Sequence, residues 1–336
     1  MKKRTLALFS AAVMAAAVMT GCSNNTTKTP STEGTTEAQT TPETTEAATE
    51  AAAKESKPQL VILGGDGAGL TAAIQAVADG MSPTKILILS GTDELAADVK
   101  EKEDFINASD TAEQFEAEIE DSYELYLADT MKAGKNTNNA EMAEFLVEGA
   151  EEAKSWIEGL GIELKGVEKK DGSSVARSYT LANGGSLAEA VSDALVKKVE
   201  ELKIPVKTGV TVKEIIMNED GVVTGVKAVV DGEEKTINSI ALVATDKELL
   251  PIISKLDIQL SKASDEKVTG VIVNTCAEAI DAKGETVPGL YAAGELISAG
   301  VHGDAVLAGN DLTATIVFGE TAGVESAIYV SDNQEQ

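Results

Sequence analysis

Arginine, histidine, cysteine and aromatic residues are all scarce in this chain of 336 residues. Only two arginines, Arg4 and Arg177, and one histidine, His302, occur, so a mechanism that needs several guanidinium or imidazole groups is excluded. The two cysteines, Cys22 and Cys276, cannot form a disulfide framework. Aromatic residues make up 3% of the chain, which leaves few surfaces on which bases or sugars could stack.

Positive charge is also in short supply. Lysine and arginine together number 28 against 56 acidic residues, and the formal net charge is -28. Binding to nucleic acid depends on basic side chains that neutralise phosphates, so this balance excludes a nucleic-acid partner. The apolar fraction of 43% is nevertheless sufficient for a folded core.

The first residues predict a targeting signal. Lys2, Lys3 and Arg4 precede an apolar run at 6–19, which is too short to span a membrane convincingly. Residues 19–22, Met-Thr-Gly-Cys, resemble the end of a bacterial lipoprotein signal peptide, in which the cysteine is lipidated. The alternative is an ordinary secretory signal followed by an incidental cysteine. We expect residues 1–21 to be removed and Cys22 to carry acyl chains such as palmitate, anchoring an extracytoplasmic protein to the bacterial cell membrane.

Residues 22–57 predict a disordered linker. After Cys22 this stretch contains no Val, Ile, Leu, Met, Phe, Trp or Tyr, and Thr, Glu, Ala and Ser dominate it. Such a segment cannot bury enough apolar surface to offset the conformational entropy lost on ordering. We expect it to tether the folded domain, residues 58–336, to the membrane.

The start of the folded domain predicts an α/β protein. Apolar runs at 59–63 and 85–89 are typical of buried parallel strands, and a segment with helical spacing at 70–78 lies between them. This β-α-β order predicts a Rossmann-like fold, a parallel sheet flanked by helices. Alternation around a turn at 218–221 predicts an additional antiparallel β element. Further helices are predicted within 110–160 and at 187–202 and 312–330, and further strands at 206–217, 222–230, 236–245, 268–275 and 289–293.

A glycine loop, residues 64–69, links the first predicted strand to the first helix. This is the position of a dinucleotide-binding loop, and Gly64 and Gly69 fit the first and third glycines of G-x-G-x-x-G. Asp66 stands where the middle glycine would let a diphosphate approach. Ser90 ends the second strand, where an acidic residue would hold the ribose. The loop by itself therefore leaves open whether a nucleotide binds.

The C-terminal sequence is more specific. Residues 287–295, 300–303 and 307–312 (Val-Pro-Gly-Leu-Tyr-Ala-Ala-Gly-Glu, Gly-Val-His-Gly and Leu-Ala-Gly-Asn-Asp-Leu) resemble the flavoprotein subunits of the fumarate reductase and succinate dehydrogenase family. These are FAD-dependent oxidoreductases, and they include soluble fumarate reductases of the flavocytochrome c type. Shorter matches lie at 60–78, 129–139, 156–161, 174–177, 184–185 and 270–278. The resemblance implies an FAD-binding fold over about residues 58–330.

The resemblance also implies where the parts of FAD are held. The glycine loop would bind the diphosphate, the end of the second strand the ribose, and the later segments the adenine, the ribityl chain and the isoalloxazine ring. The implied cofactor-binding residues are Gly64, Gly65, Gly67, Ala68, Gly69, Ser90, Val212, Ala244, Thr245, Gly294, Glu295, Asn310 and Leu312. A helix that begins near Asn310 would stabilise negative charge on a reduced flavin. No spacing of ligands predicts a metal site.

The chain departs from the family in its cofactor and substrate residues. Asp66 and Asp246 replace glycines close to the cofactor, and Ser90 replaces the ribose-binding glutamate. Val306 stands at the arginine that clamps the dicarboxylate, and Glu266 aligns with a histidine of the family. The family's clamp domain, which carries the proton-donating arginine, is reduced here to about residues 248–267.

These departures predict a degenerate active site. Reduction of a dicarboxylate requires charge neutralisation and a proton donor, and neither is supplied at the aligned positions. The favoured interpretation is a membrane-anchored, FAD-binding oxidoreductase-like protein that does not reduce fumarate. If it is active, it needs an electron donor, for which a redox partner protein is the candidate. The alternative is a non-catalytic lipoprotein that keeps the fold as a ligand-binding or scaffold module. His302 is the candidate catalytic residue, with a structural role beside the flavin as its alternative.

Overall fold

A computed structural model describes residues 57–262 and 267–334 of the chain. The predicted signal peptide, the lipidated Cys22 and the linker before Lys57 lie outside the described residues, as does Glu266. Within the described part, no helix is both long enough and apolar enough to cross a membrane.

A six-stranded sheet forms the centre of the fold. Five neighbouring strands run parallel in the order β14-β10-β1-β2-β6, and β13 is added antiparallel at the edge. All four side chains of β1, Leu-Val-Ile-Leu, are buried, as a strand covered on both faces requires. The strands are β1 (Leu60–Leu63), β2 (Ile86–Leu89), β6 (Val206–Lys207), β10 (Ala241–Ala244), β13 (Glu278–Ile280) and β14 (Thr286–Ala292).

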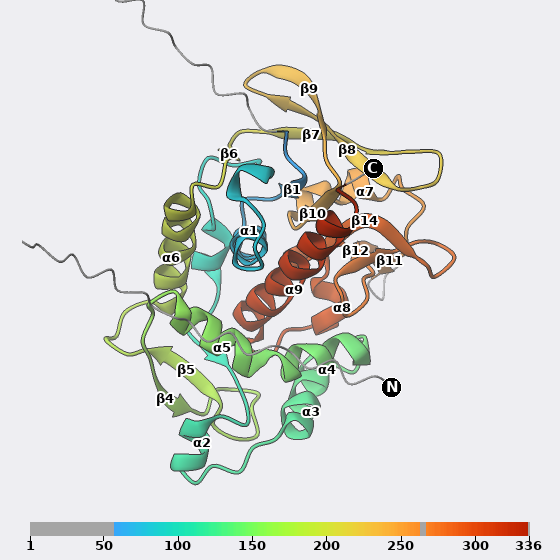
Figure 1. Cartoon of the computed structure of the whole chain (residues 1–336). Helices are drawn as coiled ribbons and strands as arrows, with labels where there is room; N and C mark the ends of the chain where they lie inside the picture. The colour runs from blue at the N-terminus through green and yellow to red at the C-terminus, as the bar shows by residue number, and fades with distance from the viewer. Residues whose placement is uncertain (1–56, 263–266, 335–336) are drawn as a thin grey trace, which may run out of the picture. The chain divides into compact units, whose positions relative to one another are not determined.

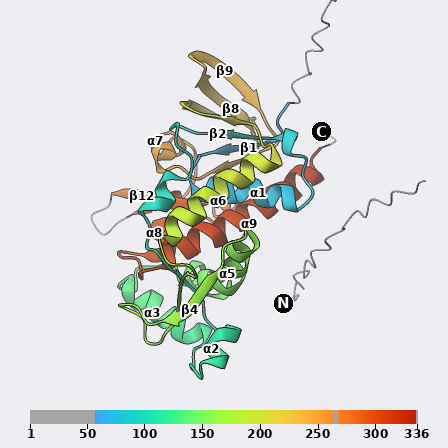
Figure 2. The ribbon, with the colours of Figure 1, turned by 90° about the vertical axis from the view of Figure 1, so that its left-hand side faces the viewer.

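Two helices that are far apart in sequence pack together against this sheet. Helix α1 (Gly67–Ala78) follows β1, and the long helix α9 (Asn310–Asp332) lies beside it near the C-terminus (Figure 1). Helix α6 (Leu187–Leu202) lies against α1 on its other side (Figure 2). Ser186 caps α6 by accepting a hydrogen bond from the Glu189 N–H. The predicted parallel sheet with flanking helices is therefore confirmed.

A three-stranded antiparallel sheet covers part of the central sheet. Its order is β7-β8-β9, and β8 lies against β10 and β14. Figure 2 shows β1 and β2 between this sheet and helix α1. Its strands are β7 (Thr211–Met217), β8 (Val223–Val230) and β9 (Glu233–Asn238).

The middle of the chain forms a helical layer and a second small sheet. Helices α4 and α5 pack against α9, and α3 and α4 pack against α8. The sheet has the order β3-β5-β4. The elements are β3 (Ile106–Asn107), α2 (Ala112–Glu116), α3 (Tyr123–Ala133), α4 (Ala140–Glu148), α5 (Ala150–Gly159), β4 (Leu164–Glu168), β5 (Ser178–Leu181) and α8 (Ser298–His302).

The remaining elements are short. The described part of the stretch 248–267, predicted to be a reduced clamp, contains the end of η3 (Lys247–Leu249), α7 (Leu250–Ile253) and β11 (Leu260–Lys262), and β11 pairs with β12 (Val268–Val271). Three further single-turn helices complete the described fold: η1 (Pro83–Lys85), η2 (Ala97–Glu101) and η4 (Gly294–Leu296).

Two of the strand predictions were wrong. The stretch 236–245, predicted as one strand, contains the end of β9 and all of β10, which belong to different sheets. The stretch 206–217 likewise divides into β6 in the central sheet and β7 in the antiparallel one. In both cases the chain leaves one sheet and enters another within a few residues, which a local apolar pattern does not reveal.

Candidate functional site

The glycine loop lies where the carboxyl ends of β1 and β10 meet. The Thr245 N–H donates a hydrogen bond to the Leu63 carbonyl at 3.0 Å. A Cβ on Gly64 would stand 2.0 Å from Thr245 Oγ1, and Gly64 has φ +147°, a conformation that side chains rarely adopt. The loop and the segment after β10 are thus brought into direct contact, at the edge where doubly wound sheets bind their ligands.

Gly294, which the resemblance predicts to bind the cofactor, lies beside the glycine loop. A Cβ on Gly294 would lie 3.0 Å from the Ala68 side chain, and the residue has φ +61°. Its neighbour Glu295 forms an ion pair with Lys247 at 2.7 Å, with both side chains largely open to solvent. The segment after β14 therefore closes the site from the side opposite β2.

Two carboxylates hold the N–H groups at the start of α1. Asp66 Oδ1 accepts from the Gly69 N–H at 2.8 Å, and Asp98 Oδ1 accepts from the Gly67 N–H at 2.9 Å. The N-terminus of a helix attracts anions because its first N–H groups have no partners within the helix. In this structure the protein's own side chains supply the anions.

The pKa values of both carboxyl groups, Asp66 and Asp98, are raised above their ordinary value. Burial, and then the charge of Asp98, raise the pKa of Asp66 to about 7. Burial also raises the pKa of Asp98, although Lys102 opposes this effect. A pair of neighbouring acids at a partly buried position disfavours full ionisation of both.

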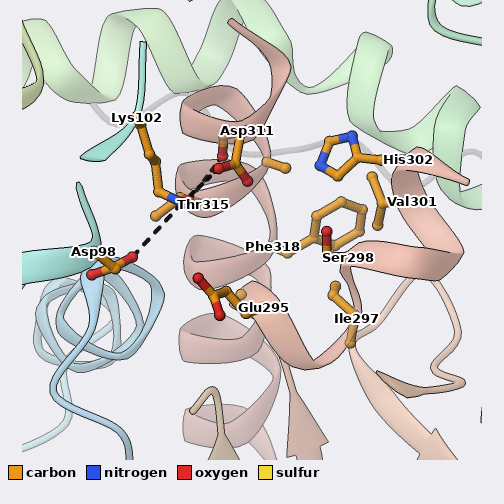
Figure 3. A pocket seen from close by; sticks show the side chains of 12 residues that line it. Asp98, Lys102, Glu295, Ile297, Ser298, Val301, His302, Asp311, Thr315 and Phe318 are labelled. Carbon is orange, nitrogen blue, oxygen red and sulfur yellow. Dashed lines mark hydrogen bonds and ion pairs between the residues drawn. The ribbon is translucent and has the colours of Figure 1, made fainter. Parts of the chain in front are cut away.

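Lys102 connects the two helix N-termini. Its Nζ lies 2.9 Å from Asp311 Oδ2, in the first turn of α9, and 3.8 Å from Asp98 Oδ2 (Figure 3). Only 5% of the lysine side chain is exposed. Burial would lower the pKa of Lys102, but the carboxylates of Asp311 and Asp98 outweigh it and the pKa is raised. The lysine is therefore a charged, paired group.

His302 lines a small cavity beside this ion-paired group. The cavity measures about 10 Å³, about the room that one water molecule needs, and Glu295 and Phe318 also line it. Burial lowers the pKa of His302 to about 4, so the imidazole is neutral at pH 7. Its Nδ1 has no hydrogen-bond partner among the described residues. Figure 3 shows the ring at the edge of the cavity, beyond Asp311.

Asn310 and Leu312, the predicted flavin contacts on α9, are fully buried. The Asn310 side chain accepts hydrogen bonds from Asn107 Nδ2 and from the Tyr126 hydroxyl, and it donates one to Thr130 Oγ1. These contacts join the start of α9 to β3 and α3. The amide of Asn310 is thus engaged within the protein.

Ser90 and Val212, which the resemblance assigns to the ribose and the adenine, lie near the carboxyl end of β2. Ser90 is buried, and its hydroxyl donates to the Thr92 carbonyl at 2.7 Å. Its own carbonyl accepts from the Val210 N–H at 2.9 Å. Val212 follows two residues later on β7, half-buried, and pairs with Ala228 of β8. Ala244 is buried at the end of β10.

Sequence reasoning missed Asp98, Lys102 and Asp311. The only local signal was the charged stretch 93–104 in the place of a glycine-rich or apolar loop. No group of three or more histidine, cysteine or acidic side chains in the described chain is arranged to hold a metal ion.

Comparison with known proteins gives a consistent picture. The model of a family described as an FAD binding domain matches residues 59–248 and 258–312. NADH:fumarate oxidoreductase of Klebsiella pneumoniae (strain 342) is 33% identical over 175 residues, which is 52% of this chain and 18% of that protein. Fumarate reductase (cytochrome) of Shewanella frigidimarina is 27% identical over 167 residues, 50% of this chain and 29% of that protein. The chain therefore spans less than a third of the length of these relatives.

Solved structures agree on the fold. The open conformation of a flavocytochrome c3 fumarate reductase superposes with a TM-score of 0.73 at 16% identity, covering 82% of this chain and 78% of that one. A 3-ketosteroid-delta4-(5alpha)-dehydrogenase from Rhodococcus jostii RHA1 superposes with a TM-score of 0.67 at 14% identity, covering 83% and 99%.

Proposed function

Because this chain belongs to the family of FAD binding domains, we propose that it is a membrane-anchored flavoprotein-type domain that has lost the ability to reduce a dicarboxylate. The resemblance to fumarate reductase flavoproteins and the assignment of FAD as the cofactor of this fold are both confirmed by the comparisons. The proposal concerns which reactions the site can still support.

The position of the substrate arginine carries this proposal. Val306 stands there, with 41% of its surface exposed. The only arginine of the described chain, Arg177, is fully buried and forms ion pairs with Asp121 and Asp129 at 2.9 and 3.2 Å. Its guanidinium also lies 4.5 Å from the centre of the Tyr126 ring. Within the described residues, no guanidinium is therefore free to neutralise a substrate carboxylate.

The other charged groups of the site also argue against the binding and reduction of a dicarboxylate. Lys102 is neutralised by the two carboxylates of Asp98 and Asp311, and Glu295, which pairs with Lys247, is a further carboxylate on the cavity wall. A dicarboxylate would meet like charges there and lose its hydration without compensation. A neutral His302, with its pKa lowered to about 4, is a poor source of a proton at pH 7.

The catalytic part of the proposal is tested by electron transfer to fumarate. Purified protein supplied with FAD and a reduced viologen dye should oxidise the dye no faster when fumarate is added. A parallel assay of a fumarate reductase shows that the conditions support turnover. Fumarate-dependent oxidation that follows the protein concentration would overturn the proposal. An enzyme acting on another small substrate would still need an electron donor, for which a redox partner protein is one candidate.

A second candidate function is a non-catalytic ligand-binding or scaffold module. The cavity beside His302, about 10 Å³, favours the scaffold form of this alternative, because a drug-sized or larger ligand needs a site of roughly 300 Å³ or more. The two candidates differ in their response to flavin. A protein that melts cooperatively, and whose melting temperature does not change at saturating FAD, would favour the scaffold.

Membrane attachment rests on Cys22 in the part of the chain before the described residues. The expected lipoprotein is labelled by palmitate in bacterial cells and sediments with the membrane fraction. Cys22→Ser should abolish the label and release the protein. Retention of the label in this variant, or sedimentation of the variant at the wild-type level, would contradict the anchor.

A further inference from the structure

Residues 92–102, here called the strap, lie directly over the glycine loop. The Ala96 N–H donates to the Gly65 carbonyl at 2.7 Å, and Ser192 Oγ of α6 donates to the Ala96 carbonyl at 2.9 Å. Ala96 has φ +50°, a left-handed conformation that is unfavourable for a residue with a Cβ. Hydrogen bonds on both sides of this residue therefore hold the strap in a conformation that it would not adopt alone.

Side chains of the strap fill the space above the glycines. A Cβ on Gly65 would stand 2.4 Å from Ser90 Oγ and 2.8 Å from Leu95 Cδ2 of the strap, and one on Gly67 would stand 2.3 Å from Val99 Cγ2. Val99 is fully buried. A loop that holds a diphosphate must leave room above its glycines, because their purpose is to let the phosphates approach the backbone. Here a Cβ at either glycine would meet a side chain of the strap, so the strap crowds the space through which a diphosphate would approach the backbone.

The strap also supplies charges where those of the cofactor would lie. Asp98 accepts the Gly67 N–H at the N-terminus of α1, the position that the family resemblance assigns to the diphosphate. Lys102 pairs with Asp311 at the N-terminus of α9, the position assigned to the isoalloxazine ring. The ion-paired chain Asp98–Lys102–Asp311 thus connects the position assigned to the diphosphate with the position assigned to the isoalloxazine ring (Figure 3).

We propose that the strap is an internal competitor of FAD: Asp98 takes the place of the diphosphate, and the cofactor enters only when residues 92–102 lift away from the glycine loop. This inference rests on the proposed function, since it assigns regulation to the same cofactor site. The apparent affinity for FAD is then lowered by the fraction of molecules in which the strap is closed. Asp66, which holds the Gly69 N–H, adds to the exclusion without belonging to the strap.

The test compares FAD affinity in variants of the strap. Asp98→Asn together with Lys102→Gln removes the charges that join the strap to both helices. We expect the dissociation constant for FAD, measured by quenching of flavin fluorescence at pH 7.5, to fall about tenfold, which corresponds to a loss of about 1.4 kcal/mol in the free energy that closes the strap. Lys100→Gln is the matched control, because Lys100 lies on the same turn, is exposed and forms its ion pair with Glu94, away from both helix N-termini. This control should bind FAD as the wild type does.

Hydrogen exchange gives a second measurement that does not depend on the variants. Saturating FAD should increase deuterium uptake in residues 92–102 of the wild-type protein while uptake in α1 falls. If the double variant fails to fold, Asp98→Asn alone should still strengthen FAD binding. Equal affinity in wild type and variants, or protection of the strap by FAD, would overturn the proposal. Those results would leave the assay for fumarate-dependent turnover untouched, so the two proposals fail separately.

Discussion

Gly323 of α9 lies so close to Ala72 of α1 that a Cβ on the glycine would stand 2.5 Å from the alanine carbonyl oxygen. One turn earlier, a Cβ on Gly319 would stand 2.9 Å from the Ala68 carbonyl. The two helices that carry the glycine loop and the Asn310 segment are therefore joined through backbone contact at small residues. This close crossing fixes the distance between the two halves of the candidate site.

Gly323→Ala should destabilise the protein. The new methyl group would press on backbone that cannot rotate away, so we expect a loss of about 1–3 kcal/mol in the free energy of unfolding. Urea unfolding followed by circular dichroism measures the change. Gly159→Ala in α5 is the control, since that glycine is exposed and has no atom within 4 Å of the added Cβ. It should be neutral or slightly stabilising, and an equal loss in both variants would argue against a tight crossing.

Arg177→Met should destabilise the protein by about 3–5 kcal/mol, because it leaves the buried carboxylates of Asp121 and Asp129 without their cation. The measurement is again urea unfolding. Lys197→Ala, which breaks an exposed pair with Glu201 on α6, should cost less than about 0.5 kcal/mol. Near-wild-type stability of the Arg177 variant would mean that this cluster tolerates the loss of its charge.

Asp66 should make stability fall as the pH rises. Its pKa is about 7 in the folded protein and near the ordinary 3.8 when unfolded. The folded state therefore holds the proton more tightly, and the contribution of this group is lost progressively between about pH 4 and pH 7. Asp66→Asn keeps an acceptor for the Gly69 N–H and removes the ionisation. We expect the melting temperature of the variant, relative to wild type, to be higher at pH 8 than at pH 5.

Asp281→Asn serves as the comparison for this pH series. Hydrogen bonds from backbone N–H groups, that of Glu285 first, lower the pKa of Asp281. Its contribution to stability is therefore present above its ordinary pKa and is lost on acidification. The melting temperature of this variant should be lowered at pH 8, opposite in sign to that of Asp66→Asn. The same pH trend in both variants would count against the assigned ionisation of Asp66.

His302 should remain neutral throughout the physiological range. Burial lowers its pKa to about 4, so the folded state resists protonation while the unfolded state takes up a proton near pH 6.5. Stability is consequently lost as the pH falls from about 6.5 to 4. The chain has a single histidine, so an NMR titration of tag-free protein observes one imidazole. We expect its ring resonances not to shift between pH 8 and pH 5.5, and a midpoint near 6.5 would refute burial.

Local sequence patterns were sufficient for the first elements of the domain and for α6. Buried apolar runs and a glycine loop predicted β1, α1 and β2 in order, and the amphipathic stretch 187–202 matches α6 residue for residue. The same patterns failed at Ser239 and Ile240, where the chain passes from β9 to β10. A change of sheet is decided by packing between distant segments, which the local alternation of residues does not contain.

The candidate site was predictable only in part, for the same reason. The resemblance placed Gly64, Ala68 and Gly294 together, and the structure shows them in contact with neighbours across the site. The pairing of Lys102 with Asp311 joins residues 209 positions apart and has no local signature. The sequence showed that Asp66 replaces a glycine of the loop, but its role as the N-cap of α1 could be recognised only from the structure.

The capping of α1 by the protein's own side-chain carboxylates has a consequence for how this protein folds. A dinucleotide fold whose loop waits for phosphates is incomplete until it meets its cofactor. Asp66 and Asp98 are always present at the loop, so the newly made chain can reach its compact state with no nucleotide in its surroundings. Maturation of this domain is thereby uncoupled from the local supply of flavin.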